Sequence, residues 1–410
     1  MDTFTSLGLS SPVLAAVEQF GHTTPTPIQA QAITPGLEKH DVLAAAQTGT
    51  GKTLAYLLPI FDNMVRFYGS RRPKKGGPYV LVLAPTRELA TQIYECAAVL
   101  AQTCNFRVVN IIGGKKYSTQ IKRLNAGCDV LIATPGRLTD LAKQRAVSLN
   151  KIHYLVLDEV DRMMDMGFWP SVHAIVRTLP KKRQTFLFSA TLSAEVKAKA
   201  TLVQANPVVI EIAQKGQTAE TVREYILPVS EHQKQDLLVA LLEEQGDTRI
   251  IVFTPTKQEA DACARRLQKA NLKADSIHAD KPQNKRDRAL RNFREGAIDV
   301  LVATDVLARG IDVAEVSYVV NYTVPAAPDD YIHRIGRTGR AGMAGRAYTF
   351  LTPSQLLEFR EIEYHTGHLM EVHNVESFSY EGERIVPDPK RPTKRGVRRG
   401  NARRPSLRRR

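Results

Sequence analysis

The chain contains 410 residues, with 57 Lys and Arg against 42 Asp and Glu, so its formal net charge is +15. This length predicts two domains, or at most three, because one domain usually spans about 100–200 residues. A composition of 43% hydrophobic and 24% charged residues is typical of globular proteins and excludes a chain that is disordered throughout.

No apolar run reaches the ~18 residues that a membrane-spanning helix needs. The first residues, Met1 to Ser6, lack the cationic and apolar parts of a secretory signal, so we expect a cytoplasmic protein without a membrane partner. The cysteines contain no closely spaced pair and no histidine cluster beside them, which argues against a zinc site or a disulfide framework. Buried, reduced thiols are therefore expected.

Most of the excess positive charge lies at the carboxyl terminus. Residues 387–410 contain eleven basic residues and one acid, a net charge of +10, whereas residues 1–386 carry only +5. This segment has four prolines and no aromatic residue, so it cannot build a core and we expect it to be disordered. Clustered basic charge indicates a polyanionic partner, and a solvated segment that only aids solubility is the alternative.

Along the first half of the chain, short runs rich in Val, Ile and Leu alternate with amphipathic stretches. A helix is expected over Glu88–Gln102, where apolar residues recur every three or four positions. Continuously apolar strands separated by helices indicate a parallel sheet covered on both faces. The expected strands are Tyr79–Ala84, Val108–Ile112, Asp129–Ala133, Tyr154–Leu157 and Thr185–Phe188.

The same pattern restarts in the second half of the chain. The expected strands are Arg249–Phe253, Ala274–His278, Asp299–Ala303 and Tyr318–Tyr322, and the expected helices are Lys257–Ala270 and Lys285–Arg294. The sequences of residues 129–134 (DVLIAT) and 299–304 (DVLVAT) are nearly identical, which indicates two domains of one architecture. We therefore predict an α/β chain with domains at 1–206 and 222–372, a linker at 207–221 and an extension at 373–410.

A phosphate-binding loop is indicated between the expected strand Val42–Ala46 and an apolar helical stretch. Glycines there let backbone N–H groups surround phosphates, and the helix N-terminus adds its positive dipole end. Lys52 would reach the β- and γ-phosphates, and Thr53 would offer its hydroxyl to Mg²⁺. A Gly/Thr turn with a surface lysine is the alternative. The loop residues are Gln47, Thr48, Gly49, Thr50, Gly51, Lys52 and Thr53.

Two carboxylates, Asp158 and Glu159, follow the expected strand Tyr154–Leu157. Asp158 would bind Mg²⁺, and Glu159 would orient and deprotonate an attacking water. A helix-capping carboxylate is the alternative interpretation of Asp158 and Asp161. Together with the phosphate loop, this pair predicts a P-loop ATPase or GTPase.

Further motifs appear in a recognisable order: GHTTPTPIQ at 21–29, APTREL at 84–89, SAT at 189–191 and YIHRIGRTGR at 331–340. With these motifs, residues 1 to about 370 resemble the DEAD-box RNA helicases of superfamily 2, most closely the bacterial RhlE-type group. The resemblance implies two tandem RecA-like domains that use ATP and Mg²⁺. It further implies RNA-stimulated ATP hydrolysis with local unwinding of short RNA duplexes or remodelling of RNA–protein complexes, and partners among ribosomal or RNA-decay assemblies.

The resemblance also implies roles for individual residues around the nucleotide. Gln29 would pair with the adenine, which favours ATP over GTP, and Phe4 would stack on the base; a capping amide and a core aromatic are the alternatives. Asp312 would meet the ribose, with a turn carboxylate as its alternative. Arg337 and Arg340 would stabilise the charge that develops on the γ-phosphoryl group, and a basic helix face is the alternative.

By the same resemblance, a set of strand-end residues would contact RNA through sugar and phosphate, without base preference. Without the family, each is a strand-end turn with a capping residue. The expected RNA-contacting residues are Pro85, Arg87, Gly114, Thr134, Arg137, Thr256 and Thr304.

Ser189 and Thr191 would couple the ATP state to the RNA site through hydrogen bonds to Asp161, although an ordinary Ser/Thr turn is the alternative. The family's name-giving Ala is replaced by Val160, which we expect to affect packing and coupling but not the carboxylates. The rivals are an ATP-gated RNA clamp with incidental turnover and a DNA-directed superfamily 2 motor. For the basic tail, which lies beyond the resemblance, its clustered charge and lack of aromatic residues favour a sequence-independent RNA tether that binds through phosphates.

Overall fold

The computed structural model describes residues 3–46, 49–69, 77–212, 222–246, 249–305, 316–339 and 344–393. Four of the predicted site residues, Gln47, Thr48, Asp312 and Arg340, lie outside these described residues. Residues 213–221 of the expected linker and 394–410 of the expected tail lie outside them as well.

The first domain is a sheet of seven parallel strands in the order β3-β4-β2-β5-β6-β1-β7. Its strands are β1 (Val42–Ala45), β2 (Val80–Leu83), β3 (Val108–Ile111), β4 (Val130–Ala133), β5 (Tyr154–Leu157), β6 (Gln184–Ser189) and β7 (Val208–Glu211). Its helices are α1 (Ser11–Gln19), α2 (Pro27–Leu37), α3 (Lys52–Tyr68), α4 (Arg87–Cys104), α5 (Tyr117–Asn125), α6 (Pro135–Lys143), α7 (Val160–Asp165), α8 (Trp169–Thr178) and α9 (Ala194–Ala200).

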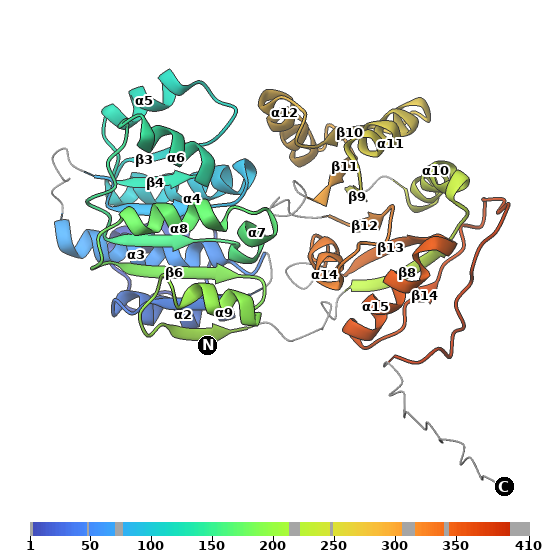
Figure 1. Cartoon of the computed structure of the whole chain (residues 1–410), viewed down its shortest axis with the longest axis horizontal. Coiled ribbons are helices and arrows are strands. Elements are labelled where there is room, and N and C mark those ends of the chain that lie inside the picture. Colours follow the sequence, from blue (N-terminus) through green and yellow to red (C-terminus); the bar gives the residue numbers. More distant parts are fainter. Residues whose placement is uncertain are drawn as a thin grey trace, which may run out of the picture.

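Alternate residues of these strands enter two separate cores. On β1, Val42 and Ala44 pack with α1–α4, whereas Leu43 and Ala45 pack with α6–α9 on the opposite face. Both faces of the sheet are therefore buried, which is why its strands are continuously apolar. In Figure 1, the arrows of this sheet point towards the second domain.

The second domain repeats this architecture, with strand order β10-β11-β9-β12-β13-β8-β14, again all parallel. Its strands are β8 (Val222–Pro228), β9 (Ile250–Thr254), β10 (Ala274–Ile277), β11 (Val300–Thr304), β12 (Tyr318–Asn321), β13 (Gly345–Leu351) and β14 (Glu371–Val372). Its helices are η1 (Glu231–Gln233), α10 (Lys234–Gln245), α11 (Lys257–Lys269), α12 (Gln283–Arg294), α14 (Pro328–Ile335), η3 (Pro353–Gln355) and α15 (Leu356–Thr366).

Renumbered from its own first strand, the second sheet has the same order as the first. The two nearly identical hexapeptides therefore occupy equivalent places, because β4 and β11 are each the fourth strand of their domain. α10 and α11 cover one face of the second sheet, and α12, α14 and α15 contribute to the core on the other. The prediction of two tandem RecA-like domains is confirmed.

Two segments differ from the expectation. Val208–Glu211, which we expected in the linker, form β7 and pair with β1, so the first domain extends beyond residue 206. Its Val-Val-Ile run satisfies the edge of β1 that would otherwise present unpaired backbone groups. Residues 387–393, which we expected to be disordered, lie against the second domain. The Arg391 side chain is buried there and forms an ion pair with the buried carboxylate of Glu363.

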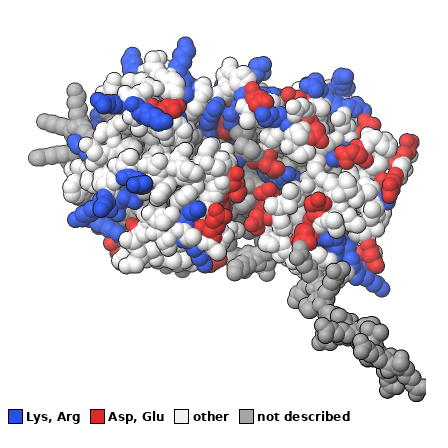
Figure 2. Space-filling view, in the orientation of Figure 1, with Lys and Arg blue, Asp and Glu red and all other residues white. Residues whose placement is uncertain are grey.

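Three of the cysteines are buried, as expected, and Cys96 is partly exposed. Among the described residues, no helix is both long and apolar enough to cross a membrane. On the face shown in Figure 2, basic side chains predominate among the charged residues of the first domain, whereas acidic and basic side chains intermingle over the second.

Candidate active site and nucleic-acid interface

The strand order sorts the predicted site residues of the first domain into two groups. β1, β5 and β6 are neighbours, and the phosphate loop, Asp158 and Ser189 stand at their carboxyl ends. β2, β3 and β4 are also neighbours, and Gly114 and Thr134 follow the last two. Ligands of open parallel sheets bind beyond the carboxyl ends of strands, so this one edge offers two adjoining sites.

The described part of the phosphate loop has the backbone that its glycines permit. Gly49 and Gly51 have φ values of 85° and 87°, in the left-handed region. A Cβ at Gly51 would lie 2.4 Å from Nε2 of Gln29, so the close approach of this amide also requires glycine. α3 begins directly afterwards at Lys52 and directs its N-terminus at the loop.

The ammonium group of Lys52 is buried, and its Nζ has no hydrogen-bond partner among the described residues. It lines a hollow together with Glu159 and Asp161 of the first domain and His333 and Arg337 of the second. A buried cation without a partner is costly, and an anion such as a phosphate satisfies it. The hollow encloses only about 10 Å³ in this structure, so it is the charge of its lining, and not its size, that suits a phosphate group.

Asp158 is buried at the end of β5, and both of its carboxylate oxygens accept hydrogen bonds. Tyr56 Oη donates to Oδ2 at 2.9 Å, and the backbone N–H of Glu159 donates to Oδ1 at 2.9 Å. Burial raises the pKa of Asp158 to about 6, against the opposing attraction of Lys52. Thr53, in the first turn of α3, lies near enough to the Tyr56 hydroxyl to oppose the rise that burial causes in the pKa of Tyr56. The two predicted Mg²⁺ ligands thus lie near one phenol oxygen, which the sequence did not single out.

Glu159 has φ = 53°, a left-handed conformation that is unfavourable for a residue with a side chain. Its Oε2 is buried and accepts no hydrogen bond among the described residues, although the Arg162 guanidinium lies 3.6 Å away. Strained backbone and an under-satisfied carboxylate are features that cluster at active sites. The geometry supports the role of a general base.

Asp161 contacts the SAT segment, but not through the expected hydroxyl of Ser189. Its Oδ2 accepts a hydrogen bond from the backbone N–H of Ala190 at 2.9 Å, while Ser189 Oγ is buried without a partner among the described residues. Thr191 is half-buried beside them. Val160 is fully buried in the core that also contains Leu187 of β6, which is the packing that we expected it to affect.

From the second domain, α14 brings two arginines to the cleft. The guanidinium of Arg337 lines the hollow beside Lys52, and its Nε donates to the carbonyl of His333 at 3.2 Å. Arg334, for which no role was predicted from the sequence, makes a two-point ion pair with Asp305 at 2.6 and 2.7 Å. The sequence feature that could have indicated a role for Arg334 is its position at the start of the run RIGRTGR, in which Arg and Gly recur.

The two residues expected at the adenine are engaged within the protein. Gln29 Oε1 accepts from the backbone N–H of Thr26 at 2.9 Å, and Nε2 donates to the carbonyl of Gly51 at 3.1 Å. Phe4 belongs to the first core, with 3% of its surface exposed. The alternatives, a capping amide and a core aromatic, are thus both present, and base recognition by either residue stays a prediction.

A second hollow of about 280 Å³ gathers most of the RNA-contacting residues predicted in the first domain. It is lined by the predicted Pro85, Arg87, Thr134 and Arg137, and by Gly113 beside Gly114. Arg137 Nη1 donates to the carbonyl of Lys115 at 2.9 Å, and its guanidinium lies 3.9 Å from the centre of the Tyr117 ring. Arg87 approaches so closely that a Cβ at Gly114 would lie 2.5 Å from its Nη1.

The second domain contributes to this hollow with Ala279 and Arg286, not with the predicted Thr256 and Thr304. Thr256 caps α11 by accepting a hydrogen bond from the backbone N–H of Glu259 at 3.2 Å, as the capping alternative describes. Thr304 ends β11, which neighbours β9. Their contact with RNA therefore stays a prediction.

Polar contacts between α4 and α12 join the two domains. Glu88 forms a buried ion pair with Arg286 and accepts from Gln283 Nε2 at 3.2 Å, and Arg87 donates to Gln283 at 3.1 Å. Lys115 reaches Asp287 at 2.6 Å. None of these contacts was predicted from the sequence, because each joins residues more than 150 positions apart. The domains are thus closed against each other.

A phosphate loop and an Asp–Glu pair at neighbouring strand ends, with an arginine of the next domain in one hollow with Lys52 and Glu159, define a P-loop ATPase made of two RecA-like domains. The family model for DEAD/DEAH box helicases matches residues 26–199, and that for the helicase conserved C-terminal domain matches residues 233–342. The DEAD-box ATP-dependent RNA helicase CshA of Bacillus subtilis (strain 168) is 41% identical over 369 residues, which cover 90% of this chain and 73% of CshA. The chain belongs to the DEAD-box ATP-dependent RNA helicases.

Solved structures bear on the arrangement of the domains. S. cerevisiae Dbp5 bound to RNA and ADP BeF₃ superposes with a TM-score of 0.82 and 31% identity, covering 92% of this chain and 96% of that one. A Dbp5 variant bound to Nup159, Gle1, IP6 and ADP reaches 0.61 with 29% identity, covering 89% and 94%. Because both structures contain Dbp5 and similar shares are covered, the domain arrangement here resembles that of the RNA-bound complex.

Proposed function

We propose that this chain hydrolyses ATP in response to RNA and uses the cycle to separate short RNA duplexes, or to remodel RNA–protein complexes, locally. The observation that carries the proposal is the shared hollow, in which Lys52 and Glu159 of one domain face Arg337 of the other. A nucleotide there contacts both domains, so its γ-phosphate favours the closed arrangement.

In this proposal Lys52 binds the β- and γ-phosphates, and Glu159 takes the proton of the attacking water. Arg337 offsets the charge that develops on the γ-phosphoryl group, an effect of about 10³–10⁵ in rate for such arginines. The roles of Phe4, Gln29, Gln47, Thr48, Asp312 and Arg340 around the nucleotide remain predictions of the family resemblance.

Mg²⁺ fits the oxygen donors that the first domain offers. Thr53 and Asp158 would hold it, since both lie next to the Tyr56 hydroxyl and both provide the hard oxygen ligands that this ion prefers. When bound, the ion neutralises charge on the phosphates. A buried carboxylate with a raised pKa, such as that of Asp158, is also stabilised in its charged form by a cation.

RNA would bind along the second hollow through backbone contacts to Arg87, Arg137 and the strand-end turns. Closure joins this surface to α12, so that only a bent single strand fits and a short duplex loses base pairs. Each lost stacking step costs about 1–2 kcal/mol, taking DNA as the guide. Hydrolysis removes the γ-phosphate contact, and the domains open and release the strand.

The experiment is a strand-displacement assay on a short RNA duplex, with Glu159→Gln as the catalytically impaired control. Wild type should release the strand with ATP, and Glu159→Gln should bind RNA and ATP but turn over slowly. The closed interface, with its buried Glu88–Arg286 pair, is what favours an ATP-gated RNA clamp as the second candidate. ATP-dependent RNA binding without any strand release would support the clamp instead.

A DNA-directed motor is disfavoured by membership of the RNA helicase family, and DNA that stimulated ATP hydrolysis as well as RNA would revive it. A cytoplasmic location, the RhlE-type subgroup and a place in ribosomal or RNA-decay assemblies remain predictions. Crosslinking and sequencing of cellular RNA bound to Glu159→Gln would identify the RNA partner directly.

A further inference from the structure

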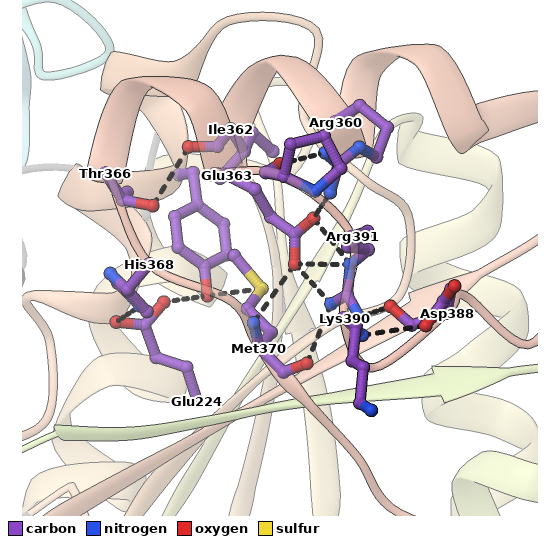
Figure 3. Close-up of polar contacts among 12 residues, drawn as sticks. Glu224, Arg360, Ile362, Glu363, Thr366, His368, Met370, Asp388, Lys390 and Arg391 are labelled. Atoms are coloured by element: carbon purple, nitrogen blue, oxygen red, sulfur yellow. Dashed lines mark hydrogen bonds and ion pairs between the residues drawn. The ribbon is translucent and has the colours of Figure 1, made fainter. Parts of the chain in front are cut away.

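Residues 387–393, which we call the C-terminal strap, contact the second domain through their own arginine, Arg391. Arg391 donates to both carboxylate oxygens of Glu363 on α15, with Nε at 3.1 and 2.8 Å, and to the carbonyl of Met370 at 2.8 Å. Its guanidinium also lies 5.5 Å from the centre of the Phe359 ring. Figure 3 shows these contacts converging on Glu363 from the strap, from α15 and from the chain before β14.

The Arg391–Glu363 pair is buried, which distinguishes it from a surface ion pair. The Glu363 side chain is fully buried and that of Arg391 is 8% exposed. A buried carboxylate is unfavourable unless it is paired and hydrogen-bonded. Glu363 has two further partners, the guanidinium of Arg360 and the backbone N–H of Met370 at 3.0 Å. Arg360 in turn donates to the carbonyl of Pro392, so it too holds the strap.

The residues that Arg391 contacts on α15 and before β14 pack directly against α14. Tyr331 of α14 is fully buried, and its hydroxyl donates to Glu224 at 2.6 Å and approaches Met370 Sδ at 3.5 Å. Tyr331 and Ile335 of α14 share one core with Phe359 and Met370. Arg391 thus hydrogen-bonds to two segments, α15 and the chain at Met370, and both pack against the buried side of α14.

The other side of α14 belongs to the nucleotide site. His333 lines the hollow, and Arg337, just after the helix, lines it together with Lys52 and Glu159 of the first domain. Arg334 ties the same helix to Asp305, whose backbone carbonyl accepts from Arg162 of the first domain at 3.3 Å. A shift of about 1 Å in such a helix moves a catalytic arginine enough to cost roughly a hundredfold in rate.

We propose that the strap, through Arg391, is a positioning element for α14 that holds Arg337 opposite Lys52 and Glu159; this rests on the proposed role of Arg337. The strap then differs in kind from the basic residues that follow it. It acts on the rate of hydrolysis and not on RNA affinity.

The test compares Arg391→Met with wild type in the full-length chain. We expect the RNA-stimulated kcat for ATP to fall about tenfold, while KM for ATP and the affinity for RNA stay within about twofold. Arg391→Lys keeps the charge beside Glu363 but cannot make all the hydrogen bonds of a guanidinium, so it should recover part of the rate. If Arg391→Met does not fold, Arg391→Lys provides the test: a lower kcat with an unchanged KM for ATP supports the inference, and an unchanged kcat contradicts it.

Leu242→Ala is the matched control, because it weakens a different core of the second domain, the one under α10 and α11. It should lower Tm and leave kcat near the wild-type value. A folded Arg391 variant with unchanged kcat, or an equal loss of kcat in Leu242→Ala, would overturn the inference. Arg337→Ala separates the two proposals: if it hydrolyses ATP normally, the role of Arg337 fails, and if it is slow while Arg391→Met is normal, only the strap inference fails.

Discussion

The hydroxyl of Tyr56 donates a hydrogen bond to Oδ2 of Asp158 at 2.9 Å, although 102 residues separate the two in the chain. Tyr56 is fully buried on α3, one turn after the phosphate loop, and its ring packs edge-on against Phe188 with centroids 5.2 Å apart. Since Phe188 precedes Ser189, one phenol links the phosphate-loop helix, the predicted Mg²⁺ ligand and the strand that leads to the coupling segment.

Replacing Tyr56 with Phe removes only the hydroxyl. We expect the Mg²⁺ concentration for half-maximal ATP hydrolysis to rise about fivefold, because a hydrogen bond that orients the carboxylate is worth about 1 kcal/mol. A titration of Mg²⁺-dependent nucleotide binding by fluorescence should show the same shift without turnover. Tyr154→Phe, at the opposite end of β5, is the matched control and should leave both titrations unchanged. Equal shifts in both variants would contradict an orienting role.

Lys115 and Asp287 face each other across the cleft at 2.6 Å, and their side chains are 46% and 39% exposed. An exposed pair is worth about 0.2–1 kcal/mol, so Lys115→Glu and Asp287→Lys should each weaken RNA binding with a non-hydrolysable ATP analogue by a few-fold. The double charge swap should restore it. Binding to RNA at several salt concentrations measures this, and Lys143→Glu on the first domain serves as a control for charge alone.

If Lys115 acts instead as a phosphate contact, the swap will fail to rescue, and Asp287→Lys will strengthen RNA binding. The cross-cleft pair is supported only if both reversals weaken binding and their combination does not. The effect should fade at high salt, because half-exposed charges are screened.

The basic tail and the strap should be separable by deletion. Residues 394–410 contain nine basic residues and no acid, while Arg391 lies outside that range. A chain ending at residue 393 should bind RNA more weakly, with a flatter dependence of log affinity on log salt, because fewer phosphate counterions are released. Its kcat at saturating RNA and its ATP affinity should stay at the wild-type values. An unchanged salt slope would contradict a phosphate-binding tail.

His368 makes the second domain's stability depend on pH. Its hydrogen bond to Glu224 raises the pKa of His368 above its ordinary value, with burial opposing the shift. The folded state therefore binds the proton more tightly, so the stabilisation is fully present below about pH 6.5 and is lost as pH rises through the folded pKa. His368→Gln should lower Tm at pH 5.5–6, and the difference from wild type should shrink above pH 8 (roughly, from the ordinary histidine value).

The partner of His368 provides the control for that experiment. Glu224→Gln removes the carboxylate charge but keeps an amide oxygen of similar size, so it should abolish the pH-dependent part of the stability difference between chains with His and with Gln at position 368. Because His368 is partly exposed, the effect is modest and is best read by calorimetry across the pH range.

Local patterns in the sequence determined the elements and the nucleotide-binding residues. Apolar runs at Tyr154–Leu157 and Val42–Ala46 predicted buried strands, and the polar residues directly after them predicted the two halves of a phosphate site. These inferences succeeded because strand burial and loop chemistry depend on residues that are close in the chain. The near identity of residues 129–134 and 299–304 likewise predicted a repeated domain, and the two domains have the same strand order.

The tertiary structure alone decided which distant residues meet. β1 lies between β6 and β7, not beside β2, and this order separates the nucleotide site from the RNA site on one sheet edge. Composition indicated disorder for the whole basic end, yet Arg391 is buried because the fully buried Glu363 requires a cation, and that requirement arises only after α15 has packed. A sequence pattern records what each segment prefers, whereas partners such as Tyr56 and Asp158 are selected by the packing of segments far apart in the chain.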